Sequence, residues 1–135
     1  MNYESYQAKQ VTLQHIAGTM PVVDIGNATV KIGQWLIHLR FCSDNQRAPG
    51  KYKFNINPNT LRSDYELWIC GRPQHYYFMP VSLMKEFYHH PEPYVDSYHP
   101  NIHIVSVDYE QHKVTYARGG TSTNLIQYLC TVLPI

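Results

Sequence analysis

The chain has 135 residues and a formal net charge of +1, with 44% hydrophobic and 16% charged residues. These values predict one globular domain over residues 1–135, and they exclude a disordered chain or one that binds nucleic acid through its overall charge. Its three widely spaced cysteines predict no disulfide framework. The N-terminal residues lack the apolar stretch of a signal peptide, and no apolar run is long enough to cross a membrane. We therefore expect a cytoplasmic protein without a membrane partner.

Hydrophobic spacing predicts the first elements. Apolar side chains at helical spacing predict a helix over residues 3–17 that ends at Gly18. Residues 20–26 form a short apolar run, typical of a buried strand that enters a turn. The alternating residues 29–42 predict one long strand or two short strands separated at Gly33.

The rest of the chain predicts more strands than helices. The later predicted elements are, in chain order, an exposed loop over 43–50, a strand over 51–56, a hairpin over 64–81, a helix over 81–90 capped by Ser82, an extended Pro-rich segment over 91–100, a strand pair over 102–118, and a helix or strand over 122–133. This order predicts an α/β (α+β) fold with a mixed central β-sheet flanked by helices.

Five segments between Val22 and Tyr88 follow one another in a familiar order: VVDIG, WLIHLRF, KYKFNI, SDYELWICG and HYYFMPVSLM. In this order they resemble the PD-(D/E)xK (restriction-endonuclease-like) nucleases, in particular the small homing and restriction-type members. The resemblance covers about half of the chain. It implies a restriction-endonuclease-like fold and a divalent-metal-dependent endonuclease that hydrolyses DNA phosphodiester bonds.

The resemblance also implies a set of catalytic residues. Asp24 matches the first aspartate of the family motif, His38 stands where an acid or glutamine is usual, and Arg40 stands where a lysine is usual. Mg²⁺ or Mn²⁺ would be held by Asp24 and His38, with Glu4 of the first helix as a further ligand. The motif is degenerate, because imidazole suits Mn²⁺ better than Mg²⁺ and arginine stays protonated.

Each of these residues also has a structural interpretation. Asp24 precedes Gly26 and is typical of an aspartate that caps a turn through the backbone. His38 is compatible with a half-buried histidine that has found a hydrogen-bonding partner. Arg40 is compatible with a salt bridge across the sheet.

Basic residues flank the expected site and predict contacts with DNA phosphates. They are Arg47, Lys51, Lys53, Arg62 and Arg72. Scattered, solvated cations are the alternative, and with a different strand register Lys53 would take the place of Arg40. The histidine-rich residues 89–103 have no zinc-site spacing, which favours a solvated loop.

Three functions stay open at this point. The first is the metal-dependent endonuclease. The second is a nuclease-fold module that has lost catalysis and binds nucleic acid or a protein partner. The third is an accessory protein that meets another protein through its twelve tyrosines. The resemblance to nucleases also leaves a homodimer open, because many small nucleases cut both strands only as dimers.

Overall fold

A computed structural model describes residues 3–133 of the chain, apart from the side chain of Thr60. Within this part the chain forms two α-helices, α1 (Tyr3–Ala17) and α2 (Val81–Tyr88), and nine strands. The strands are β1 (Val22–Gly26), β2 (Thr29–Ile32), β3 (Trp35–Cys42), β4 (Lys51–Ile56), β5 (Tyr65–Cys70), β6 (Tyr76–Pro80), β7 (His103–Asp108), β8 (Lys113–Ala117) and β9 (Thr121–Asn124). Short 3₁₀ turns cover Pro58–Thr60, Arg118–Gly120 and Ile126–Tyr128.

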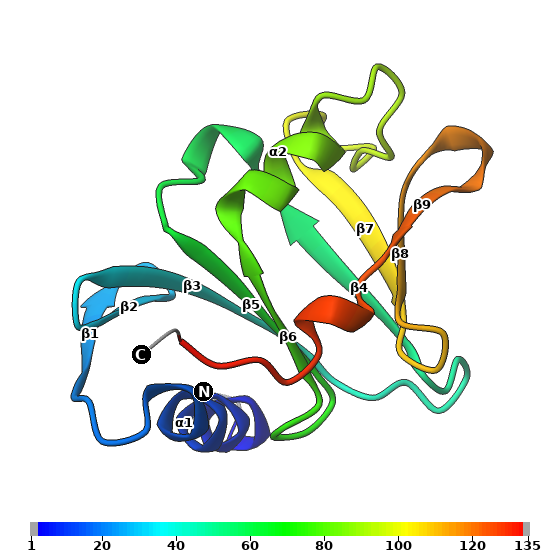
Figure 1. The fold of residues 1–135 in the computed structure, drawn as a ribbon. Coiled ribbons are helices and arrows are strands. Elements are labelled where there is room, and N and C mark those ends of the chain that lie inside the picture. Colours follow the sequence, from blue (N-terminus) through cyan, green and yellow to red (C-terminus); the bar gives the residue numbers. More distant parts are fainter. Residues whose placement is uncertain (1–2, 134–135) are drawn as a thin grey trace.

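The strands form two sheets instead of the single central sheet that we predicted. One sheet has the order β1-β2-β3-β5-β6 and the other the order β4-β7-β8-β9 (Figure 1). The first sheet is mixed, because β3 and β5 run parallel while the other neighbours are antiparallel. The predicted mixed α+β class is confirmed. The single sheet was wrong because β4 leaves its neighbours in sequence and pairs with β7.

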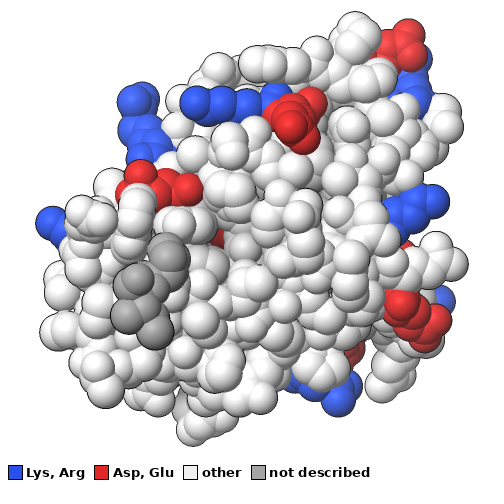
Figure 2. All heavy atoms as spheres, in the orientation of Figure 1, with Lys and Arg blue, Asp and Glu red and all other residues white. Residues whose placement is uncertain are grey.

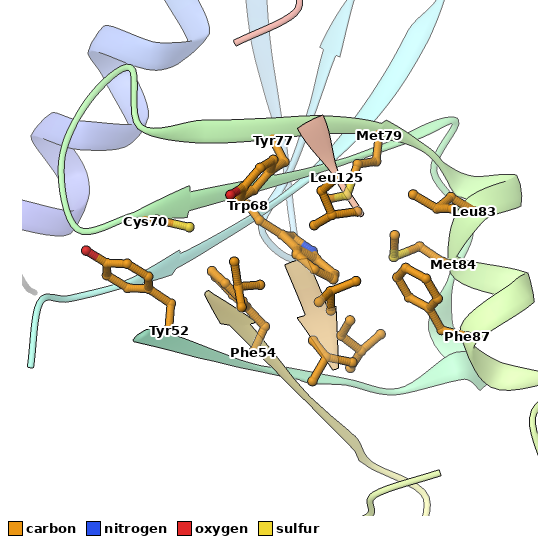
Figure 3. Close-up of a cluster of buried hydrophobic side chains, with 14 residues drawn as sticks. Tyr52, Phe54, Trp68, Cys70, Tyr77, Met79, Leu83, Met84, Phe87 and Leu125 are labelled. Atoms are coloured by element: carbon orange, nitrogen blue, oxygen red, sulfur yellow. The ribbon is translucent and has the colours of Figure 1, made fainter. Parts of the chain in front are cut away.

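Two cores lie on the two faces of the five-stranded sheet. Helix α1 covers one face with Ala8, Leu13 and Ile16. On the other face, Trp68 of β5 stacks on Phe54 of β4, with ring centroids 5.0 Å apart (Figure 3). The core around Trp68 fills the space between the two sheets and also receives side chains of α2. Strand β5 is therefore covered on both faces, which suits a central strand with a nearly continuous apolar sequence.

Strand β1 is exposed along its whole length, although we predicted a buried strand there. It forms one edge of its sheet, and Val23 and Ile25 keep 53% and 51% of their surface in solvent. The prediction was wrong because an apolar run reports a tendency to form a strand and not the position of that strand in a sheet. At the opposite edge, Leu129 bridges to Tyr77 of β6.

Most other predicted elements are confirmed. Residues 29–42 form two strands, and the turn between them has Gly33 at φ +60°. The hairpin of β5 and β6 and the pair of β7 and β8 also form. The predicted Ser82 cap is wrong, because α2 begins after Pro80, and no side chain caps it.

Candidate functional site

A buried carboxylate lies at the centre of the molecule. Glu66 on β5 has no solvent-exposed surface. Its Oε2 lies 2.9 Å from Nδ1 of His38 and accepts a hydrogen bond from Ser63 Oγ at 3.4 Å, and its Oε1 lies 3.4 Å from Nε of Arg40. Both carboxylate oxygens thus have partners.

The strand register brings this group together. In the parallel pair of β3 and β5, His38 is the direct neighbour of Glu66, and Arg40 is the neighbour of Trp68. Residues two apart on a strand share a face, so both basic side chains reach the same carboxylate. Removing a carboxylate from water is costly unless opposite charges and hydrogen bonds compensate it. Arg40, just over one-fifth exposed, provides the opposite charge, and Ser63 donates a hydrogen bond.

Two aromatic side chains continue the polar group toward the second sheet. Burial raises the pKa of the Tyr88 hydroxyl, and the nearby Glu66 carboxylate raises it further. The ring of His103 meets the Tyr88 ring edge-on, with centroids 5.0 Å apart. Neither the Tyr88 hydroxyl nor His103 Nδ1 has a hydrogen-bonding partner within the described residues, so each has capacity left for water or a ligand.

The His38 ring forms part of the wall of a cavity of about 540 Å³. Nδ1 of the ring is buried against Glu66. The cavity combines two basic side chains with hydroxyl and amide groups. It is lined by Ile25, Gly26, Asn27, Thr29, Leu36, His38, Arg62 and Ser63. No carboxylate belongs to this lining, as far as residues 3–133 are concerned.

Asp24 and His38 lie on opposite faces of the sheet, so the predicted convergence of these two residues on one metal ion is wrong. Asp24 pairs with Val30, which belongs to the core beneath α1. Thr29, which directly precedes Val30 on β2, pairs with His38. Neighbouring residues on a strand point to opposite faces, so Asp24 faces α1 and His38 faces away from it. Asp24 accordingly lines a second hollow, which contains Lys9 of α1 and shares three lining residues with the His38 cavity.

The structural interpretations of Asp24 and Arg40 are confirmed instead, whereas His38 Nδ1 lies 2.9 Å from Glu66 Oε2 without forming a regular hydrogen bond among the described residues. The Asp24 carboxylate accepts a hydrogen bond from the backbone N–H of Gly26 at 2.9 Å and so caps the turn after β1. His38 is half-buried against Glu66, and Arg40 forms a salt bridge to Glu66 on the neighbouring strand.

Glu4 does not complete a metal site either. It is exposed in the first turn of α1 and lines neither the His38 cavity nor the hollow beside Asp24. Across residues 3–133, no three His, Cys, Asp or Glu side chains are grouped in a way that could hold a metal ion. This includes the histidine-rich residues 89–103. The residues that the resemblance implies as ligands for Mg²⁺ or Mn²⁺ therefore do not fit such an ion.

Of the five predicted DNA-contacting residues, Arg62 is the one that lines the cavity. Lys51 forms an ion pair with Asp108, and Arg72 lies 3.5 Å from Asp44. The remaining two are Arg47, in the loop before β4, and Lys53, on the exposed side of that strand. Lys53 thus does not take the place of Arg40.

Sequence reasoning missed Glu66, which organises the site. The signal was present in the segment YELWIC, where one charged residue interrupts an apolar strand. A charge at a fully buried strand position needs partners, so it marks a candidate site.

No protein-family model matches this chain, and no curated protein or solved structure is significantly similar to it. Within residues 3–133, no helix has the length and apolar character that crossing a membrane requires.

Acid is expected to destabilise the fold through His103. Burial lowers the pKa of His103 below its usual value of 6.5. The unfolded chain binds a proton near pH 6.5 and the folded chain only at lower pH, so the free energy of unfolding falls as the pH drops below about 6.5. Urea unfolding at several pH values between about 8 and about 5 measures this loss. His103→Phe, which keeps the ring, should show a smaller loss, and an equal loss in both proteins would contradict the assignment.

Proposed function

We propose that this chain is a nucleic-acid-binding module that holds a backbone phosphate in the His38 cavity and does not cleave it by a metal-dependent reaction. The observation that carries the proposal is the make-up of the cavity wall, which presents His38 and Arg62 together with hydroxyl and amide groups and no carboxylate among the described residues. Such a wall is complementary to an anion and not to a metal cation.

The Glu66 carboxylate is not expected to repel an anion in the cavity. Both of its oxygens are engaged by His38, Ser63 and Arg40. The guanidinium of Arg62 carries no such carboxylate partner in the lining of the cavity. Guanidinium and imidazolium groups form charge-assisted hydrogen bonds with phosphate oxygens, and these bonds are among the stronger ones in proteins.

The size of the cavity favours a nucleotide unit over a lone phosphate ion. A volume of about 540 Å³ lies within the usual range for pockets that take small organic molecules. On the face shown in Figure 2, basic and acidic side chains lie mainly near the margins and close to one another, without a broad basic area. Because the formal net charge of the chain is only +1, binding would rest on a few local contacts and not on the general field of the protein.

The resemblance to PD-(D/E)xK nucleases remains part of the proposal. The five segments that carry the resemblance lie, in chain order, on β1, β3, β4, β5 and β6, the order on which the resemblance rests. Metal-dependent cleavage is not part of it, because Asp24 and His38 face opposite sides of the sheet. The module would be a relative of nucleases that has kept a phosphate site and lost the metal ligands.

Arg62→Ala is expected to weaken binding of a fluorescein-labelled single-stranded DNA about tenfold, because one charge-assisted contact is lost. Fluorescence anisotropy over a series of salt concentrations measures this. The slope of log affinity against log salt should become shallower by about 0.7, the value for one phosphate contact on a single strand. His38→Ala should also weaken binding.

Arg118→Ala is the charge-matched control. Arg118 lies exposed in the 3₁₀ turn between β8 and β9, and its removal should leave the affinity unchanged. Supercoiled plasmid should stay intact with the wild-type protein in Mg²⁺ or Mn²⁺. Absence of DNA binding at low salt, or equal affinities for Arg62→Ala and the wild type, would refute the phosphate site. Nicking that Asp24→Ala abolishes would restore the endonuclease.

A further inference from the structure

Two of the three cysteines face each other across neighbouring strands. Cys42, the last residue of β3, is the direct neighbour of Cys70, the last residue of β5, in the parallel pair of strands. Both thiols are free. Adjacent strands lie about 4.8 Å apart, and directly paired residues of a sheet point to the same face. This spacing lies within the range of about 4.4 to 6.8 Å between Cα atoms that a disulfide can bridge.

The two thiols differ in their access to solvent. Cys70 is fully buried in the core around Trp68, where Figure 3 shows its sulfur between Tyr52 and Trp68. Burial raises the pKa of the Cys70 thiol, and the nearby Cys42 raises it further. Cys42 is partly exposed at the margin of the same core. A small oxidant in solution would therefore reach Cys42 first, and Cys70 lies behind it.

We propose that Cys42 and Cys70 form an oxidative modification site that takes a small hydroperoxide as its reactant. The Cys42 thiolate attacks the terminal oxygen of the hydroperoxide and the O–O bond breaks. Cys42 sulfenic acid forms, and the other oxygen leaves as an alkoxide, or as hydroxide when the reactant is hydrogen peroxide. The Cys70 sulfur then attacks the Cys42 sulfur. The S–O bond breaks, the S–S bond forms, and the Cys70 proton leaves with the hydroxyl group as water. Overall, two thiols are oxidised by two electrons and one hydroperoxide is reduced.

The crosslink would tie together the two strands that carry the buried polar group. His38 and Arg40 lie on β3, and Glu66 lies on β5. A bond between the ends of these strands fixes their register close to the candidate site. The crosslink itself does not depend on the proposed binding of nucleic acid, so the two proposals can fail separately.

Peptide mapping tests the proposal cleanly, because trypsin places the three cysteines on three different peptides. These peptides cover residues 41–47, 63–85 and 119–135. The folded protein is treated with one equivalent of hydrogen peroxide, alkylated in denaturant and digested without reductant. We expect peptides 41–47 and 63–85 to appear joined, and the number of thiols open to alkylation to fall from three to one.

Cys130 supplies the matched control, because it is exposed and its Sγ donates a hydrogen bond to the carbonyl oxygen of Gln74 at 2.9 Å. Cys130→Ser should keep the joined peptides, and Cys42→Ser should abolish them while the circular dichroism spectrum stays native. When the protein is treated with peroxide in urea, peptides 41–47 and 63–85 should no longer be joined in preference to other cysteine pairs. The proposal is overturned if Cys42 and Cys70 stay open to alkylation while Cys130 is oxidised, or if Cys42 stops at a sulfinic or sulfonic acid.

Discussion

Trp68→Ala is expected to lower the free energy of unfolding by about 4 kcal/mol, which is among the largest effects of a single substitution in a core. Trp68 has no solvent-exposed surface and stacks on Phe54 of the other sheet. Its removal would leave a cavity between the two sheets at the place where they share one core. Urea unfolding followed by circular dichroism measures the loss.

The chain contains a matched control for this substitution, because Trp35 is its second tryptophan. Trp35 is partly exposed at the start of β3 and meets Tyr65 edge-on. Trp35→Ala should cost clearly less than Trp68→Ala. Equal losses in the two variants would show that the stability does not depend on the core between the sheets in the way described.

Glu66→Gln is expected to cost about 3 kcal/mol of folding free energy, because it leaves two basic groups beside a neutral amide. The substitution keeps the size of the side chain, so the loss reports the charge and not a cavity. His38 and Arg40 would keep their positions on β3 but lose the carboxylate that both contact. Chemical denaturation at pH 7 measures the difference from the wild type.

Glu86→Gln is the control, since Glu86 is exposed on α2 and the same change of charge should have little effect there. If Glu66→Gln leaves the free energy of unfolding unchanged, the contacts of the carboxylate with His38 and Arg40 stabilise the fold by no more than the burial of the carboxylate costs. In that case the buried group would be explained by its role in the site and not by stability.

Local patterns predicted the elements of this fold well. Helical spacing identified α1 and its end at Gly18, and the predicted strand over 51–56 is β4, whose alternating residues Tyr52, Phe54 and Ile56 are buried. Both patterns arise from the repeat of a single element, so the sequence of that element is sufficient to reveal them. The pairing of β4 with β7 depends instead on residues about fifty positions apart, and no local pattern reports such a partner.

The candidate site could not be predicted for a related reason. Whether Asp24 and His38 share a face depends on the number of residues in the two turns that separate them. One turn contains Asn27 and Ala28, both at positive φ, and the pairing shifts between Asp24 and Gly26. A difference of one residue in either turn would move a side chain to the other face of the sheet. The order of motif residues along the chain was therefore compatible with two opposite arrangements.

The uneven edges of the five-stranded sheet limit how copies of this chain could assemble. Residues 128–131 run alongside the outer edge of β6. There the backbone N–H of Cys130 donates a hydrogen bond to the Tyr76 carbonyl, and Leu129 forms a β-bridge with Tyr77. Strand β1, at the other edge, carries no such cover in the described part of the chain. If β1 paired with β1 of a second copy about a twofold axis, the exposed edge of this sheet would be covered. Growth along this sheet would then stop at a pair of molecules and could not continue into a fibre.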